Sequence, residues 1–408
     1  MRPKFWLAAI VFFLAGGPLA QAGGPDVNEL LHSGKIRDGE SQLVDYLQKN
    51  PEDDQARFGL GAVQFLRSVE HLAQSLYRYG TGIQSPAAGA LPFLRLPVLP
   101  NPNPEKVSYD LARKVFEEML ADLARAEATL AAIKSDDVAL RIQLGPTRFD
   151  YDSDGEPDDS FQKILVRYAG GGIREPQAAD SEVAFDRGDV AWLRGYCHLL
   201  SALLEFALAH DSRELFDRTA HLYFPNPDTP YKSLLSLNAG GQSPGFTNEI
   251  LDVVAFIHLI RLPVVEPRRL QASLAHFEQV FALSRESWKF IVAETDDDHE
   301  WLPGPKQHGV LGVPVAQEQI DGWHEFLDEA ESLLAGKRLA PFWRGKGMRG
   351  INLRKVFTEP QTFDLVLWIQ GSAAVPYLEE GELTRKEVWD RLGRIFGGEF
   401  IGFALWFN

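Results

Sequence analysis

The 408-residue chain contains a single cysteine, Cys197, so no disulfide bond can form within one chain. It is also poor in positive charge, because 41 Lys and Arg residues against 57 Asp and Glu residues give a formal net charge of −16. Nucleic-acid-binding proteins carry a basic surface, and binding to an anionic membrane surface needs basic clusters. The charge balance therefore argues against both kinds of partner.

Long hydrophobic runs are scarce after residue 22. No later stretch reaches the about 18 uninterrupted apolar residues that a membrane-spanning helix needs. The longest candidate, Ile250 to Leu262, is interrupted by Asp252, His258 and Arg261. We therefore expect no integral membrane segment in the mature protein.

Residues 1–22 have the features of a secretory signal peptide. Arg2 and Lys4 supply the positive start, a short apolar run follows, and Ala20-Gln21-Ala22 is a small-residue cleavage site. The alternative, an uncleaved anchor helix, is disfavoured because the apolar run is too short to cross a bilayer. The sequence thus predicts an exported protein, periplasmic or extracellular.

Strand-like alternation is also rare, and helical periodicity dominates. Apolar residues recur at the three- and four-residue spacing of an amphipathic helix in most of the chain. The predicted helices span residues 36–49, about 54–79, 108–133, 189–210, 212–222, 248–261, 267–293, 315–335 and 384–396. Ser108 and Asp189 are predicted N-caps, and Thr384 with Glu387 has the spacing of a capping box.

One helical segment resembles a tetratricopeptide repeat, on the residues Leu43, Pro51, Ala56, Leu60-Gly61, Ala73 and Tyr77. The resemblance covers about residues 39–80 and has no convincing second copy. Arg67-Ser68-Val69, where a turn belongs, has no glycine, so one long helix over 54–79 is an open alternative. We expect an all-α fold of stacked antiparallel helix pairs, similar to a helical repeat, with long ordered loops at 224–246, 301–314 and 336–350.

The predicted organisation has four parts. A signal peptide (1–22) precedes a tetratricopeptide-like helical segment (23–84), a proline-rich connection (85–104) and a main helical domain (105–408) with an inserted acidic loop. Six prolines in the connection disfavour helix there. The tail at 400–407 is expected to dock on the core or on a partner, because it is too apolar to remain exposed to water.

The strongest chemical motif is the run Asp150-Tyr151-Asp152-Ser153-Asp154-Gly155-Glu156-Pro157-Asp158. Carboxylates at alternate positions of a tight loop converge on one point, and calcium prefers oxygen ligands. The run resembles the calcium loop of EF-hands, dockerins and thrombospondin type-three repeats. That resemblance implies a calcium ion bound by the side chains of Asp150, Asp152 and Asp154, the backbone carbonyl of Glu156 and, directly or through water, Asp158.

The resemblance fails at the twelfth position, where an acidic residue is expected and Phe161 stands instead. The shell would then be closed by another acidic residue, for which the candidates are Asp159, Glu182, Asp186 and Asp189. We expect a structural ion that pins a crossover between helices. The alternative is a solvated acidic turn, because Asp-Gly and Ser-Asp are ordinary turn sequences.

Three other constellations admit a functional and a structural interpretation. Cys197 beside His198 is either a thiol site or a buried inert thiol. His198 and Glu205, with Arg194 nearby, either line a pocket or form a satisfied buried network. The acidic run 295–301 is either a ligand set or a charged helix end, and the structural interpretation is favoured for all three.

The sequence contains no recognisable catalytic set, phosphate loop or dinucleotide fingerprint. It therefore predicts an exported, calcium-binding, α-helical binding or scaffold module, with a protein or peptide as the class of partner. The alternative is an exported helical hydrolase or lyase acting on polysaccharide. Such an enzyme would show a deep pocket in which two carboxyl groups converge with shifted pKa values.

Overall fold

The computed structural model describes residues 24–81, 98, 100–160, 162–163, 182–231, 246–310, 312, 314–344, 349–397, 400 and 403–404. The predicted signal peptide and most of the proline-rich connection lie outside these residues, and so does Phe161. Among the helices that the structure describes, none combines the length and the apolar character needed to cross a membrane.

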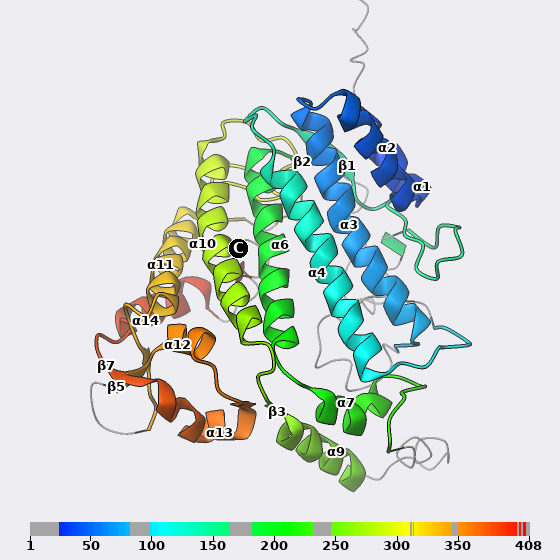
Figure 1. Cartoon of the computed structure of the whole chain (residues 1–408). Coiled ribbons are helices and arrows are strands. Elements are labelled where there is room, and N and C mark those ends of the chain that lie inside the picture. The colour runs from blue at the N-terminus through cyan, green and yellow to red at the C-terminus, as the bar shows by residue number, and fades with distance from the viewer. Residues whose placement is uncertain are drawn as a thin grey trace, which may run out of the picture.

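Helices dominate, as the sequence predicts. Four long ones, α3, α4, α6 and α10, lie side by side and form the body of the molecule (Figure 1). The helices are α1 (Val27–Ser33), α2 (Ile36–Lys49), α3 (Asp54–Arg78), α4 (Tyr109–Ala131), α6 (Arg187–Leu208), α7 (Arg213–Thr219), α9 (Phe246–Leu259), α10 (Pro267–Ala293), α11 (Gln317–Leu334), α12 (Leu353–Thr358), α13 (Leu365–Gln370) and α14 (Lys386–Phe396), with 3-10 turns η4 (Ala220–Leu222) and η5 (Ser372–Tyr377).

The segment that resembles a tetratricopeptide repeat consists of α2 packed on α3. Helix α3 runs without a break through residues 67–69, where that repeat would place its turn. Its N-cap is Asp53, whose carboxylate accepts a hydrogen bond from the Ala56 N–H at 2.9 Å. The open alternative of one long helix is therefore the one observed.

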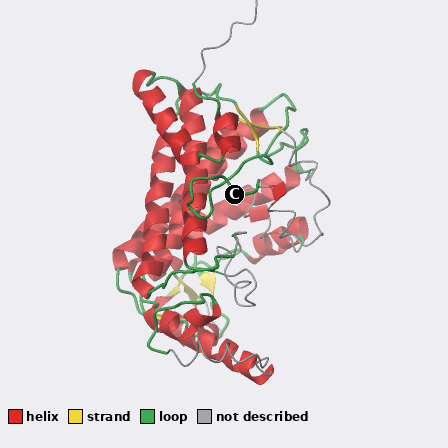
Figure 2. Ribbon diagram, turned by 90° about the vertical axis from the view of Figure 1, so that its right-hand side faces the viewer, coloured by secondary structure: helices red, strands yellow, loops and turns green. Residues whose placement is uncertain are grey.

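Among the described residues, three small antiparallel sheets accompany the helices, and their strands are short pieces among the loops (Figure 2). Strand β1 (Leu140–Gln143) pairs with β2 (Glu182–Phe185), in the register Leu140↔Phe185 to Gln143↔Glu182. Strands β3 (Arg261–Leu262) and β6 (Phe363–Asp364) form a second sheet, and β4 (Ala340–Pro341), β5 (Arg349–Ile351) and β7 (Leu378–Glu380) form the third. Because β1 pairs with β2, the ends of the segment that carries the acidic loop are held together.

The described residues build two main cores. The first core takes side chains from α1, α2, α3, α4 and α6, and so joins residues on both sides of the predicted proline-rich connection. The second core joins α10, α11 and α14 with Phe403 of the apolar tail, whose ring is stacked on Trp288 at 6.4 Å. The described part of the tail is therefore docked on the core.

Two of the three predicted caps are wrong, each for a different reason. Ser108 does cap α4, through a hydrogen bond from the Leu111 N–H at 3.2 Å. Asp189 lies one turn inside α6, where it completes a capping box with the true N-cap, Asp186. The Thr384 hydroxyl instead donates to the buried carboxylate of Glu329 at 2.5 Å, so it caps no helix.

Candidate metal centre

The acidic loop is anchored by two aromatic residues that alternate with its first two aspartates. Phe149 and Tyr151 are buried in the first core, with ring centroids 5.5 Å apart. Successive side chains of an extended chain point to opposite sides. Burying Phe149 and Tyr151 therefore directs Asp150 and Asp152 away from that core.

Helix α3 fixes the position of Asp150 through its backbone. The Asp150 N–H donates to Glu70 Oε1 at 2.9 Å, and Gln74 Nε2 donates to the Asp150 carbonyl at 2.7 Å. Glu70 and Gln74 are four residues apart and so share a helix face. Burial raises the pKa of Glu70, which also forms an ion pair with Arg67.

The turn directs backbone N–H groups onto the carboxylates. The Gly155 N–H donates to Asp150 Oδ2 at 3.1 Å, and the Asp154 N–H donates to Asp152 Oδ1 at 3.1 Å. Gly155 has φ +91°, a conformation that side-chain-bearing residues rarely adopt. Glycine at this position therefore lets the chain fold back on Asp150.

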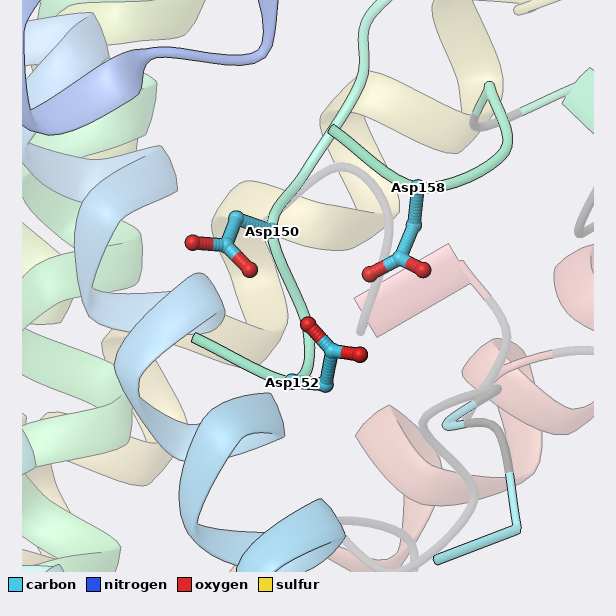
Figure 3. Close-up of side chains that lie close together, drawn as sticks. All are labelled: Asp150, Asp152 and Asp158. Carbon is cyan, nitrogen blue, oxygen red and sulfur yellow. The ribbon is translucent and has the colours of Figure 1, made fainter. Parts of the chain in front are cut away.

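Three of the five predicted ligands come together. One carboxylate oxygen from each of Asp150, Asp152 and Asp158 lies within 4.8 Å of the others, around a common space (Figure 3). Asp158 is held there by the Tyr151 N–H, which donates to Asp158 Oδ2 at 2.7 Å. Asp150 Oδ1 is buried and has no hydrogen-bond donor among the described residues.

The side chains of the other two predicted ligands, Asp154 and Glu156, are not part of this group. Asp154 Oδ1 accepts a hydrogen bond from the Glu156 N–H at 2.8 Å, and both residues are exposed. The prediction for Glu156 concerned its backbone carbonyl, so its exposed side chain does not conflict with that role.

The three clustered carboxylates repel one another. Burial, followed by the neighbouring charges of Asp154 and Asp150, raises the pKa of Asp152. Burial also raises the pKa of Asp158, with added contributions from Asp152, Asp150 and Asp154. A cation placed between these groups would replace repulsion by attraction.

The residues suggested by the sequence for closing the shell lie in other interactions. Asp159 is 3.5 Å from Lys163 Nζ, and Glu182 accepts from Arg141 at 2.9 Å. Asp186 and Asp189 belong to the first turn of α6. The structure adds one acidic residue beside the loop that the sequence analysis did not single out: Glu70, which accepts the Asp150 N–H but is not part of the group of three carboxylates.

A polar cavity of about 330 Å³ adjoins the loop on the side of α3. It is lined by the α1–α2 junction, by α3 and by the loop itself, through Gly34–Asp38, Arg67, Glu70, Gln74, Asp150, Ser153 and Gly155. Water therefore has access to Asp150, so a bound ion would not need a shell made of protein oxygens alone.

The polar stripe of α6 forms a satisfied network, as the structural interpretation expected. Arg194 donates to Glu127 at 2.9 Å, and the Nδ1 atoms of His198 and His276 are 2.7 Å apart. Cys197 is only 1% exposed, and burial raises the pKa of its thiol to about 12. Such a thiol is not a nucleophile at neutral pH, because the thiolate is the reactive form.

Comparison with known proteins identifies no relative, so the candidate site is argued from the geometry of this chain alone. No protein-family model, no curated protein and no solved structure matches the chain.

Proposed function

We propose that residues 150–158 bind a calcium ion, and that the ion has a structural role in an exported α-helical binding module. The observation that carries the proposal is the convergence of the Asp150, Asp152 and Asp158 carboxylates within 4.8 Å. Calcium accepts six to eight oxygen ligands in irregular geometry, and water can complete its shell. Calcium would tie the loop to α3, because Asp150 is hydrogen-bonded to Glu70 and Gln74.

An apolar cavity supports the binding role. It has a volume of about 350 Å³ between α4, α6, α7 and α9, and its lining includes Phe116, Leu208, Phe216, Tyr223 and Phe256. Ligand pockets commonly have volumes of about 300–1,000 Å³ and mostly apolar walls. An apolar side chain of a protein or peptide partner matches this lining.

The alternative, an enzyme acting on polysaccharide, has less support. Carboxyl groups do converge at Asp186, Glu294 and Glu300, and burial raises the pKa values of Glu294 and Glu300. The neighbouring cavity, however, has about 130 Å³, and among the described residues that line it only Asp189 is polar. A sugar presents many hydroxyl groups that need partners, so we do not propose an enzyme.

A melting experiment with charge-neutral variants tests the calcium proposal. Asp150→Asn, Asp152→Asn and Asp158→Asn together keep the side-chain size and remove three charges. In chelator we expect the triple variant to melt above the wild type, because the repulsion is gone. In millimolar calcium the order is expected to reverse, since a ligand at 100 times its Kd stabilises by about 2.7 kcal/mol.

The matched control is Asp45→Asn, an exposed carboxylate on α2 outside the loop. It should leave the calcium-dependent rise in melting temperature unchanged. The proposal fails when calcium and chelator give the wild type the same melting curve, or when the triple variant keeps the full rise.

A further inference from the structure

A second group of carboxylates gathers where α6 begins and α10 ends. Oxygen atoms of Asp186, Glu294 and Glu300 lie within 4.8 Å of one another. These residues are the N-cap of α6, the C-cap of α10 and a residue of the following loop. Asp186 is far from the other two residues in the sequence, so two distant parts of the chain meet at this group.

One oxygen of each carboxylate accepts a hydrogen bond from a backbone or amide N–H group, and Glu294 is also hydrogen-bonded to Asp186. Asp186 Oδ1 accepts from the Gly188 N–H at 2.6 Å, Glu294 Oε2 from Gln307 Nε2 at 3.0 Å, and Glu300 Oε1 from the Asp298 N–H at 3.0 Å. Among the described residues, no N–H or basic side chain reaches their second oxygens. The described part of the protein therefore orients the three groups without pairing any of them with a basic side chain.

A fourth carboxylate, Asp189, lies behind this group and is the independent sign of a ligand. Its side chain is 4% exposed, Oδ2 accepts from the Asp186 N–H at 3.0 Å, and buried Oδ1 has no hydrogen-bond donor among the described residues. Burial raises the pKa of Asp189, and the nearby charges of Asp186 and Glu300 raise it further, so Asp189 adds a fourth acidic group beside the cluster. A buried carboxylate oxygen without a partner costs about 1–3 kcal/mol or more.

No positive charge in the described structure compensates this concentration of acid. Arg141, the basic residue that reaches the adjoining acidic run, is paired with Asp298 and Glu182 instead. Burial and then the hydrogen bond to Asp186 raise the pKa of Glu294 to about 9. The negative C-terminal end of the α10 dipole lies here beside the positive N-terminal end of the α6 dipole, so the two helix dipoles offset each other.

We propose that Asp186, Glu294 and Glu300, with Asp189 behind them, form a second divalent-cation site that clamps the start of α6 to the end of α10. Hard oxygen ligands from separate, irregular segments suit calcium better than magnesium, which demands near-octahedral geometry. The site shares no residue with the 150–158 loop and does not depend on that loop binding calcium.

The neighbouring tryptophans give the site its own spectroscopic signal. Trp301 follows Glu300 directly, and its ring is 5.8 Å from that of Trp192 on α6. The segment 23–191, which holds the loop, has no tryptophan. Terbium bound between α6 and α10 should therefore emit when tryptophan is excited selectively.

The experiment titrates terbium, and then calcium by equilibrium dialysis, into the full chain. Its variants are Glu294→Gln with Glu300→Gln, and the triple Asn variant of the loop. Removing a partner that only supports a metal ligand typically lowers metal affinity by about 10- to 100-fold. We expect the cluster variant, which loses two proposed ligands, to lose at least that much affinity for the ion. The loop variant should keep the tryptophan-sensitised emission.

Calcium stoichiometry separates the two sites. Two ions per wild-type chain, and one in each variant, support both proposals. One ion in the wild type and none in the loop variant overturns the second site and leaves the loop intact. One ion in the wild type that only the cluster variant loses supports the second site and overturns the loop.

Folding of the cluster variant is checked in chelator. There it should melt at or above the wild type, because Glu300→Gln removes a charge from the repelling group, while Glu294, with its pKa of about 9, has little charge to lose at neutral pH. Should it fail to fold, the loop variant decides alone: one bound calcium supports the second site, and none overturns it.

Discussion

Single residues in the acidic loop owe their roles to partners distant in sequence. Asp150 is a loop residue, yet its N–H and C=O are both bound by α3, through Glu70 and Gln74. The alternation of aspartates was visible in the sequence because it is local. Glu70 was not found from the sequence, because its hydrogen bond to Asp150 joins residues that are 80 positions apart and depends on how α3 packs.

Cys197 illustrates how burial decides the chemistry of one side chain. Its thiol is 1% exposed, and its pKa is raised to about 12 by burial and then by the charge of Glu127. We predict that the native protein does not react with a thiol reagent at pH near 8, measured by absorbance of the released thiolate. Reaction should begin only in denaturant, along the unfolding curve.

The same reagent on the unfolded chain provides the control, since the thiol is then exposed. Native protein that reacts at the rate of the unfolded chain would show that Cys197 is accessible, and would restore the thiol-site interpretation.

At the scale of elements, helix positions followed from periodicity. Helices over 36–49 and 267–293 have the predicted bounds, because strong amphipathic patterns and Pro267 mark their limits. The short helices α1, α12 and α13 were not predicted, since six or seven residues contain too few turns to show a helical period in the sequence. Thr384 shows the other limit, because a buried acceptor from α11 outcompetes a local cap.

Two helical glycines make opposite predictions. A Cβ on Gly61 of α3 would lie 2.4 Å from Leu130 Cδ2 and 2.5 Å from Leu130 Cγ of α4, whereas a Cβ on Gly393 of α14 would meet nothing within 4 Å. Gly61→Ala should therefore destabilise by about 1–3 kcal/mol through overpacking. Gly393→Ala should stabilise by about 0.5–1 kcal/mol through helix propensity.

Both free energies of unfolding come from chemical denaturation, and each variant serves as the other's control. Equal stabilisation by the two substitutions would mean that α3 and α4 are not in close contact at Gly61.

At the scale of the whole molecule, α6 and α10 join the two cores. Trp192 of α6 contacts both cores, and Ser273 of α10 donates to the Ala202 carbonyl at 2.8 Å inside the interface. Which helices pair could not be predicted, because every apolar stripe is compatible with several partners. The proposed cation between Asp186 and Glu294 lies at one end of this same interface.

The interface also contains a histidine pair, His198 and His276, from which we predict that acid destabilises the fold. His276 of α10 faces His198 and Glu205 of α6, and Glu127 of α4. The two Nδ1 atoms are 2.7 Å apart, so one must donate and the other accept, and both cannot be protonated there. Burial, and then the charge of His198, lowers the pKa of His276 despite the opposing carboxylates.

A lowered folded-state pKa means that the unfolded chain takes up the proton first as pH falls. The contribution of His276 to stability is therefore complete above the unfolded value of about 6.5, and is lost as pH falls from there through the folded value. We predict that His276→Gln removes this part of the pH dependence, measured as free energy of unfolding at a series of pH values. His258→Gln, on the exposed surface of α9, should keep the wild-type slope. A His276→Gln curve parallel to the wild type would mean that acid weakens the molecule elsewhere than at the α6–α10 interface.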